Sequence, residues 1–173
     1  KVSDASQVAD ERQITIVATF IDNDVDTLPD TWEGLVGLNP ASTDTDGDNI
    51  SDPDEVGDIN APTNTDGVDL IDALDTDSDN DGVDDIDEAG DADLNTAAVD
   101  TDGDQTPDFR DLDSDDDTVN DDTDNCRLDQ NLNQNDLDSN LIGDACDDDV
   151  DGDGINDDGD GSGTVGDSIC ADG

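Results

Sequence analysis

The sequence has no histidine, only four basic residues and very few aromatic ones. The lack of imidazole excludes His-assisted Ser or Cys nucleophiles and His-ligated zinc, so we do not expect an enzyme. Against the four basic residues stand fifty-four Asp and Glu residues, which gives a formal charge of −50. Nucleic acid and anionic membrane surfaces are not expected as partners, because both need basic side chains to neutralise phosphate. Cations are the partners to expect.

Apolar residues are scarce as well, at 29% of the chain, with aromatics at 2%. This is too little apolar surface for an ordinary hydrophobic core. The mutual repulsion of the acids also opposes any compact state unless cations bind. No apolar run approaches the ~20 residues that cross a bilayer as a helix, so no membrane span is expected.

Cysteine is limited to Cys126, Cys146 and Cys170. Three cysteines are too few for a disulfide scaffold, and none of them has the C-x-x-C spacing of zinc or redox sites. One disulfide and one remaining thiol is the favoured interpretation. Cys170 is then either a free thiol or bonded to a cysteine beyond Gly173 or in another copy of the chain, and extracellular chemistry favours a bond.

Acidic residues are abundant in a fixed pattern, at positions 1, 3, 5, 9 and 12 of a loop that occurs seven times. These spacings place oxygen ligands around a calcium ion, and the backbone carbonyl of position 7 is a further ligand. Zinc and copper favour nitrogen and sulfur donors, and magnesium keeps more of its water. In the order 1, 3, 5, 7, 9 and 12, the predicted ligands are Asp22, Asp24, Asp26, Leu28, Asp30 and Glu33; Asp44, Asp46, Asp48, Ile50, Asp52 and Glu55; Asp77, Asp79, Asp81, Val83, Asp85 and Glu88; Asp100, Asp102, Asp104, Thr106, Asp108 and Asp111; Asp113, Asp115, Asp117, Val119, Asp121 and Asp124; Asp136, Asp138, Asn140, Ile142, Asp144 and Asp147; Asp149, Asp151, Asp153, Ile155, Asp157 and Asp160.

The loops are themselves arranged in a repeat. Those that start at Asp100 and Asp113 are thirteen residues apart, and the pair recurs 36 residues later. One period earlier lies a degenerate loop with Val68 at position 5, whose predicted ligands are Asn64, Asp66, Asp72 and Asp75. Three copies, 64–99, 100–135 and 136–171, indicate an elongated array in which each unit contacts its neighbours.

This period divides the chain into three parts: an N-terminal strand segment at 1–21, calcium loops with a short helix at 22–63, and three two-loop repeats at 64–173. Residues 13–21 are rich in β-branched side chains and predict a strand. It either packs on the first loop or is donated to a neighbouring subunit.

A helix is expected at about 29–36, with Trp32, Leu35 and Val36 on one face. Trp32, Phe20 and Phe109 are expected in small apolar clusters.

The best-preserved stretch resembles the thrombospondin type 3 repeat, and the resemblance covers roughly residues 64–170. It is carried by Asp124, Asn125, Cys126, Gly143, Asp144, Ala145, Cys146 and Asp147, followed by Asp149, Val150, Asp151, Gly152, Asp153 and Gly154. The resemblance implies nearly irregular backbone wrapped around calcium and a disulfide between Cys126 and Cys146. Arg127 stands where the family has proline.

Glycine is the expected residue at position 6, but five of the seven loops have another residue there. Those loops are expected to turn differently or to bind calcium more weakly. The residues concerned are Thr27, Asn49, Gln105, Thr118 and Leu141.

Residues 22–39 are similar to bacterial extracellular calcium repeats in which an EF-hand-like loop runs into a short helix. We therefore expect an extracellular or cell-surface, bacterial protein whose fold is mostly irregular, loop-rich and stabilised by calcium, with a short N-terminal strand and one or two short helices. Seven divalent ions would still leave a formal charge of about −36, so seven or more calcium ions are expected.

The expected function is structural: calcium would stiffen the chain into a stalk, a spacer or the subunit of a filament. The expected partners are calcium ions and copies of the same chain or other surface proteins. The main alternative is a calcium-dependent adhesin module that binds protein or glycan. Glycosidase chemistry by paired carboxylates and a disordered polyanionic calcium buffer are more distant alternatives.

Overall fold

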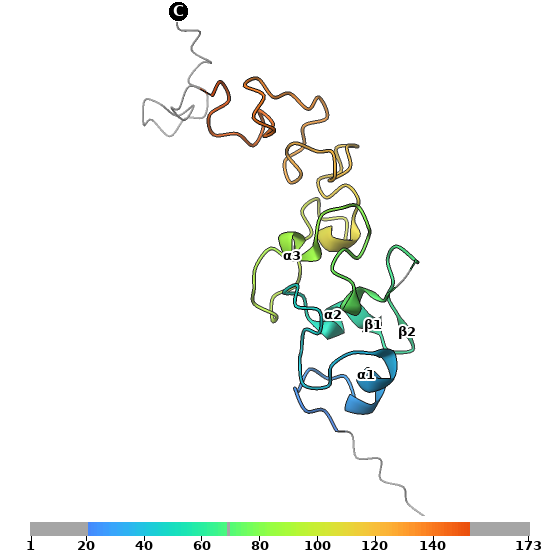
Figure 1. The fold of residues 1–173 in the computed structure, drawn as a ribbon. Helices are drawn as coiled ribbons and strands as arrows, with labels where there is room; N and C mark the ends of the chain where they lie inside the picture. The colour runs from blue at the N-terminus through green and yellow to red at the C-terminus, as the bar shows by residue number, and fades with distance from the viewer. Residues whose placement is uncertain (1–20, 69, 153–173) are drawn as a thin grey trace, which may run out of the picture.

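A computed structural model describes residues 21–68 and 70–152 of the 173-residue chain. Figure 1 shows these residues as an elongated succession of loops, with α1 (Asp30–Val36) at one end and the last described loops at the other. The strand predicted at 13–21 lies outside the described residues except for Ile21. Phe20, Cys170 and four predicted ligands, Asp153, Ile155, Asp157 and Asp160, also lie outside them.

Regular structure is short and sparse in the described residues. Besides α1 there are two α-helices, two single turns of 3₁₀ helix and one antiparallel pair of strands with Gly57 opposite Pro62. In chain order these are α2 (Asp52–Val56), β1 (Gly57–Asp58), β2 (Ala61–Pro62), η1 (Asp72–Leu74), α3 (Asp85–Glu88) and η2 (Asp108–Arg110). The prediction of a mostly irregular, loop-rich fold is confirmed, although helical turns are more numerous than the one or two expected. None of the helices in this part has the length and apolar character needed to cross a membrane.

The helix predicted at 29–36 is confirmed as α1. Pro29 precedes its first residue with extended backbone, and Gly37 ends it at a φ of 106°, donating its N–H to the carbonyl of Glu33. Trp32 and Val36 pack against the first apolar cluster, but Leu35 is 81% exposed. The predicted face is confirmed for Trp32 and Val36, whereas Leu35 lies at its solvent-exposed edge.

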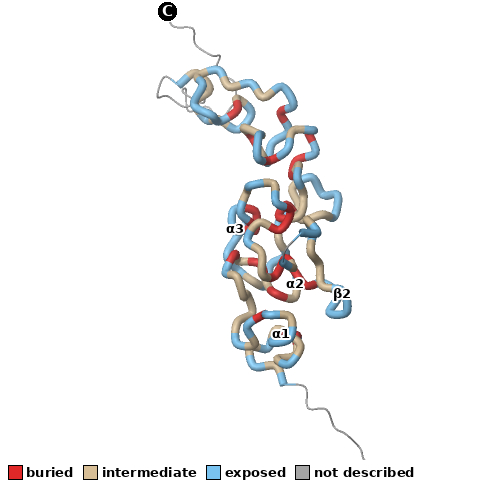
Figure 2. Tube along the Cα trace, turned by 45° about the vertical axis from the view of Figure 1, so that its right-hand side comes forward, coloured by how far each residue is buried: buried red, intermediate tan, exposed pale blue. Residues whose placement is uncertain are grey.

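Two small apolar clusters take the place of a single core. Each gathers buried side chains from segments that are distant in sequence. In Figure 2 many of the buried residues lie beside α2 and α3, and others are scattered along the loops toward the C-terminal end. The first cluster contains Leu28, Leu38, Val56 and Ala73, with Trp32, Val36 and Leu74 partly buried against it; the second contains Ile50, Ala89 and Phe109, with Ala98 against it. The prediction that Trp32 and Phe109 belong to small clusters is confirmed.

Two arginines and one disulfide link segments that are distant in sequence. Arg110 places its Nε 2.7 Å from a carboxylate oxygen of Asp72 and donates from Nη2 to the carbonyl oxygen of Glu55. Arg127 places its Nη1 2.8 Å from a carboxylate oxygen of Glu88. The disulfide joins Cys126 to Cys146, whose Cα atoms are 5.7 Å apart, as the family resemblance implied.

Candidate metal sites

All seven described loops, including the degenerate one, are closed by the same backbone hydrogen bond. The N–H of position 9 donates to the carbonyl of the residue before position 1, at 2.8 to 3.1 Å. Each loop takes the number of its first residue, so that loop 22 is residues 22–33. In this notation the closed loops are 22, 44, 64, 77, 100, 113 and 136. The five short helical segments all begin at position 9, so the helical turn brings position 12 back toward the loop.

The carboxylate of position 9 is held inside its own loop. Asp52 accepts hydrogen bonds from the backbone N–H and the hydroxyl of Thr45, at 2.7 and 2.8 Å. The same pair of bonds occurs between Thr65 and Asp72, Ser78 and Asp85, Thr101 and Asp108, and Ser114 and Asp121. The sequence reasoning assigned position 9 to the ion and missed this bond. The recurrence of Ser or Thr at position 2 is a signal that could have revealed it.

Positions 1 and 5 shape the turn. The carboxylate of Asp44 accepts hydrogen bonds from the N–H groups of positions 4 and 6, and that of Asp48 accepts one from the N–H of Ile50 at position 7. Asp22, Asp100 and Asp136 accept from positions 4 and 6 of their own loops in the same way. At Asp26, Asp48 and Asp81 the bond to position 7 uses one oxygen and leaves the second without a partner.

Position 6 has a left-handed backbone in every described complete loop, whether or not it is glycine. Its φ is 77° at Asn49 and 90° at Thr27, compared with 102° at Gly82. Gln105, Thr118 and Leu141 have φ values of 80° to 88°. The expectation that loops without glycine turn differently is wrong. The carboxylate of position 1 holds the turn despite the steric cost of a Cβ in this region.

Replacing Leu141 by glycine should therefore stabilise the protein. The left-handed backbone costs a residue with a Cβ about 1–2 kcal/mol, and the greater freedom of unfolded glycine offsets about half of the gain. We expect an increase of about 0.5–1 kcal/mol in the free energy of unfolding with calcium present, measured by urea denaturation. Leu141→Ala is the matched control, because it removes the exposed side chain and keeps the Cβ. An equal gain in both variants would contradict the explanation.

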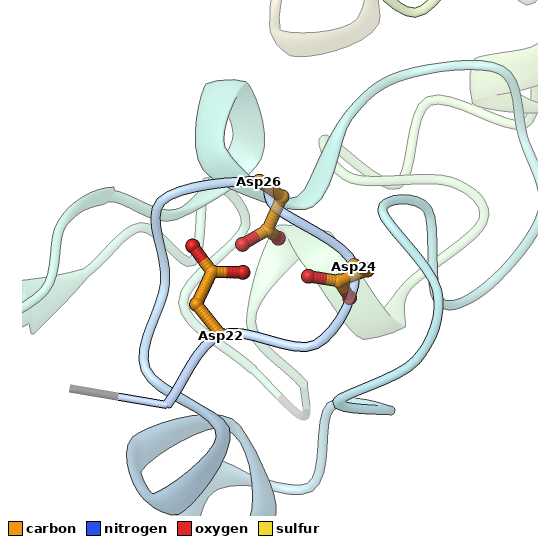
Figure 3. Close-up of side chains that lie close together, drawn as sticks. All are labelled: Asp22, Asp24 and Asp26. Atoms are coloured by element: carbon orange, nitrogen blue, oxygen red, sulfur yellow. The ribbon is translucent and has the colours of Figure 1, made fainter. Parts of the chain in front are cut away.

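The predicted ligands at positions 1, 3 and 5 converge in three loops. Figure 3 shows the carboxylates of Asp22, Asp24 and Asp26 pointing toward one another across loop 22. In that group, one carboxylate oxygen from each residue lies within 4.8 Å of the others. The same holds for Asp44, Asp46 and Asp48 and for Asp77, Asp79 and Asp81. Each group is a cage of acidic oxygens large enough for a cation.

Many of these oxygens are buried without a hydrogen-bond partner. Among the described residues, every buried side-chain polar atom without a partner is a carboxylate oxygen at position 1, 3, 5 or 12 of a loop. They belong to Asp24, Asp26, Glu33, Asp46, Asp48, Glu55, Asp77, Asp79, Asp81, Glu88, Asp115 and Asp124. Position 9 contributes none of them, consistent with its bonds to position 2. Buried acceptors in native proteins are normally satisfied, so these positions fit a bound cation.

The electrostatics of the loops point the same way. Burial away from water, together with the negative charges of Asp48, Asp46, Asp52 and Asp85, raises the pKa of Glu55 to about 11. Burial likewise raises the pKa of Asp46 to about 7. Burial raises the pKa of Glu88 to about 9, although the Arg127 guanidinium acts in the opposite direction. A nearby cation favours the ionised form of a carboxyl and reverses such shifts.

No protein-family model matches this chain, and no curated protein matches it either. The site is therefore interpreted from its own geometry.

Loop 64 differs from the others in how its polar groups are satisfied. Asp72 accepts from Arg110, Asp66 accepts from the Asn80 side chain and the Val68 N–H, and Asn64 accepts from the Gly67 N–H. Within its described residues, which exclude Asp69, this loop contributes no buried oxygen without a partner. In loop 64, protein donors therefore satisfy side chains at positions 1 and 3, whose counterparts in other loops have unpartnered oxygens. The loop nevertheless keeps the backbone hydrogen bond that closes the others.

The aliphatic side chains at position 7 are not all placed alike. Leu28 and Ile50 are buried in the two apolar clusters, whereas Ile142 is 46% exposed. Val83, Thr106 and Val119 are half-buried. Among the described loops, the side chain at position 7 is therefore buried only in loops 22 and 44. These two loops also have the largest number of unpartnered buried oxygens.

Proposed function

We propose that this chain is a calcium-binding structural protein in which metal ions take over the role of a hydrophobic core. The observation that carries the proposal is the set of buried carboxylate oxygens without partners, all of which occupy the ligand positions of a calcium loop. Burying an ionised carboxylate costs several kcal/mol unless it is paired. The chain has only four basic residues to set against this cost.

Calcium fits these groups better than other cations. The donors are carboxylate oxygens at spacings of two residues, with a glutamate at position 12 in loops 22, 44 and 77. Calcium takes six to eight such oxygens in flexible geometry, whereas magnesium requires a near-octahedral shell and retains water. Histidine is absent and two of the three cysteines are joined in a disulfide, so softer metals have few preferred ligands.

The consequence of filling the loops is rigidity. Apolar residues make up only 29% of the chain, and the ions would reduce the repulsion that otherwise expands it. The arrangement supports an extracellular, thrombospondin type 3-like array that serves as a stalk, a spacer or a filament subunit. Extracellular modules bind calcium at about 10⁻⁴–10⁻³ M, which suits a permanent structural role.

The test is a calcium titration followed by circular dichroism and by size-exclusion chromatography with light scattering. We expect cooperative compaction with calcium, reversal with EGTA and little effect of magnesium at the same concentration. A chain that stays expanded at millimolar calcium would refute the proposal and favour a polyanionic linker.

A second candidate function is an adhesin module. The observation in its favour is a concentration of exposed apolar side chains over residues 128–142, where Leu132 is 68% and Leu141 is 84% exposed. The same titration separates an adhesin module from a filament subunit, because a filament subunit grows in mass after it folds. An adhesin module folds with calcium and remains monomeric.

A further inference from the structure

Two groups of acidic side chains combine ligands from different loops. In one, carboxylate oxygens of Asp26 and Glu33 in loop 22 lie within 4.8 Å of Asp52 in loop 44 and of each other. In the other, Asp48 and Glu55 in loop 44 are grouped in the same way with Asp85 in loop 77. Both groups combine positions 5 and 12 of one loop with position 9 of the next complete loop, so the arrangement recurs.

The glutamates in these groups indicate a ligand independently of the clustering. Glu33 and Glu55 are both 0% exposed, and neither oxygen of either carboxylate has a hydrogen-bond partner. Asp48 is 2% exposed and also has an unpartnered oxygen. Three acidic groups this close, with a fully buried glutamate that has no partner on either oxygen, are stabilised by a positive charge among them.

The carboxylate from the next loop is able to act as a ligand while it keeps its hydrogen bonds to position 2 of its own loop. Asp52 accepts one hydrogen bond on each oxygen from Thr45, and Asp85 does so from Ser78. Each carboxylate oxygen has two lone pairs, so each retains an acceptor site. The bonds to position 2 fix the carboxylate in a position to reach the preceding loop.

A third buried glutamate at position 12, in loop 77, has a positively charged partner. Glu88 of loop 77 is 2% exposed, and Arg127 approaches one of its oxygens at 2.8 Å. At Glu33 and Glu55 no arginine or lysine makes this contact within the described residues. A guanidinium from a distant segment thus supplies at Glu88 the positive charge that the other two glutamates lack.

We propose that the ions of loops 22 and 44 each take a ligand from the following loop, Asp52 for the first and Asp85 for the second. This inference rests on the proposed function, since it assumes that the loops hold calcium. Each ion then ties two loops together, and filling one loop organises a ligand of its neighbour. Calcium would stiffen the junctions between loops as well as the loops themselves, and binding at neighbouring loops would be cooperative.

Trp32 provides a readout for one of these sites. It is the only tryptophan of the chain, and it directly precedes the ligand Glu33 in α1. Terbium(III) occupies calcium sites, and energy transfer from tryptophan acts only over short distances. Terbium luminescence excited through Trp32 in the full chain therefore reports on loop 22.

The decisive variant is Asp52→Asn. Asparagine can keep both bonds to Thr45, since a threonine hydroxyl also accepts hydrogen bonds, but it removes the charged ligand. We expect about a tenfold or larger loss of terbium affinity at loop 22, as is typical of lost metal-site partners. The matched control is Asp54→Asn, which removes one charge from an exposed position of the same helix and should leave the affinity unchanged.

Glu33→Gln separates failure of the coupling from failure of the proposed function. If Glu33→Gln weakens terbium binding and Asp52→Asn does not, the ligand from the next loop is refuted while the loop site stands. If neither variant has an effect, loop 22 is not a metal site and both proposals fall for this loop. Calcium calorimetry adds a third outcome, in which Asp52→Asn removes one ion and leaves the terbium affinity of loop 22 intact. That result would place a separate ion between the loops and overturn the shared ligand.

Discussion

Replacing Glu55 by glutamine should stabilise the calcium-free fold and weaken calcium binding at the same time. Glu55 is 0% exposed, and both of its oxygens lack a partner. Burial raises its pKa to about 11, so at pH 7 the calcium-free fold must take up a proton that the unfolded chain does not hold. With an ordinary value near 4.5 in the unfolded chain, this uptake costs about 3 kcal/mol at pH 7. Glutamine avoids the cost and also removes a proposed calcium ligand.

The two effects are measured separately. In EGTA, trimethylamine N-oxide favours the compact state, and the variant should fold at a lower concentration of this osmolyte than the parent. In a calcium titration without osmolyte, the variant should need more calcium to fold. Asp54→Asn is the control, because it removes a charge from the adjacent, exposed residue and should change both midpoints only slightly. A variant that is destabilised under both conditions would show that Glu55 has a packing role unrelated to metal.

The positions of the loops could be predicted from the sequence because calcium ligands in such a loop are close neighbours along the chain. Asp44, Asp46 and Asp48 converge in space simply because the turn between them is tight. The helical turn that carries position 12 was visible only at α1, where Pro29, Trp32 and Val36 mark a helix. The other helical segments contain three to five residues. They follow from loop closure and are too short to show a hydrophobic periodicity in the sequence.

Contacts between loops could not be predicted, since they depend on how successive loops pack. Asp85 is thirty residues from Glu55, and Arg127 is thirty-nine from Glu88, and no local pattern relates either pair. Arg127 was noted only as a departure from the proline of the resembling family, whereas the structure gives it an ion pair. Each of the two arginines in the described residues forms an ion pair with an acidic residue of a distant segment, Arg110 with Asp72 and Arg127 with Glu88.

The loops of the array differ in how their acidic side chains are satisfied. Loops 22, 44 and 77 have glutamate at position 12 and contribute most of the unpartnered oxygens, whereas loop 64 is satisfied by protein donors. Loop 64, satisfied by protein donors, thus lies between candidate metal sites that share the same closed backbone. Loss of the acid at position 5, as at Val68, does not prevent closure, since closure uses the backbone of position 9 and of the residue before position 1.

The stability of the chain should change with pH in opposite directions with and without calcium. Burial raises the pKa of Glu33, Asp46 and Asp79 to about 7 and that of Glu88 to about 9, above their ordinary values near 4. The calcium-free fold therefore binds more protons than the unfolded chain. Its stability from this source is complete below about pH 4 and is lost as the pH rises through about 7 to 9. In EGTA the chain should be most compact near pH 4–5 and should expand toward pH 8.

Calcium should reverse this dependence, because the ion binds deprotonated carboxylates and its binding releases protons. The calcium concentration at half-folding should rise steeply as the pH falls below about 7, so the curves with and without calcium should approach each other near pH 4–5. The measurement is the hydrodynamic radius from pH 4 to 8 in EGTA and in calcium, repeated in 0.5 M sodium chloride. Salt screens exposed charges and affects buried ones much less, so the opposite slopes should persist. A calcium midpoint that does not change between pH 5 and 8 would mean that the buried carboxylates are not the ligands.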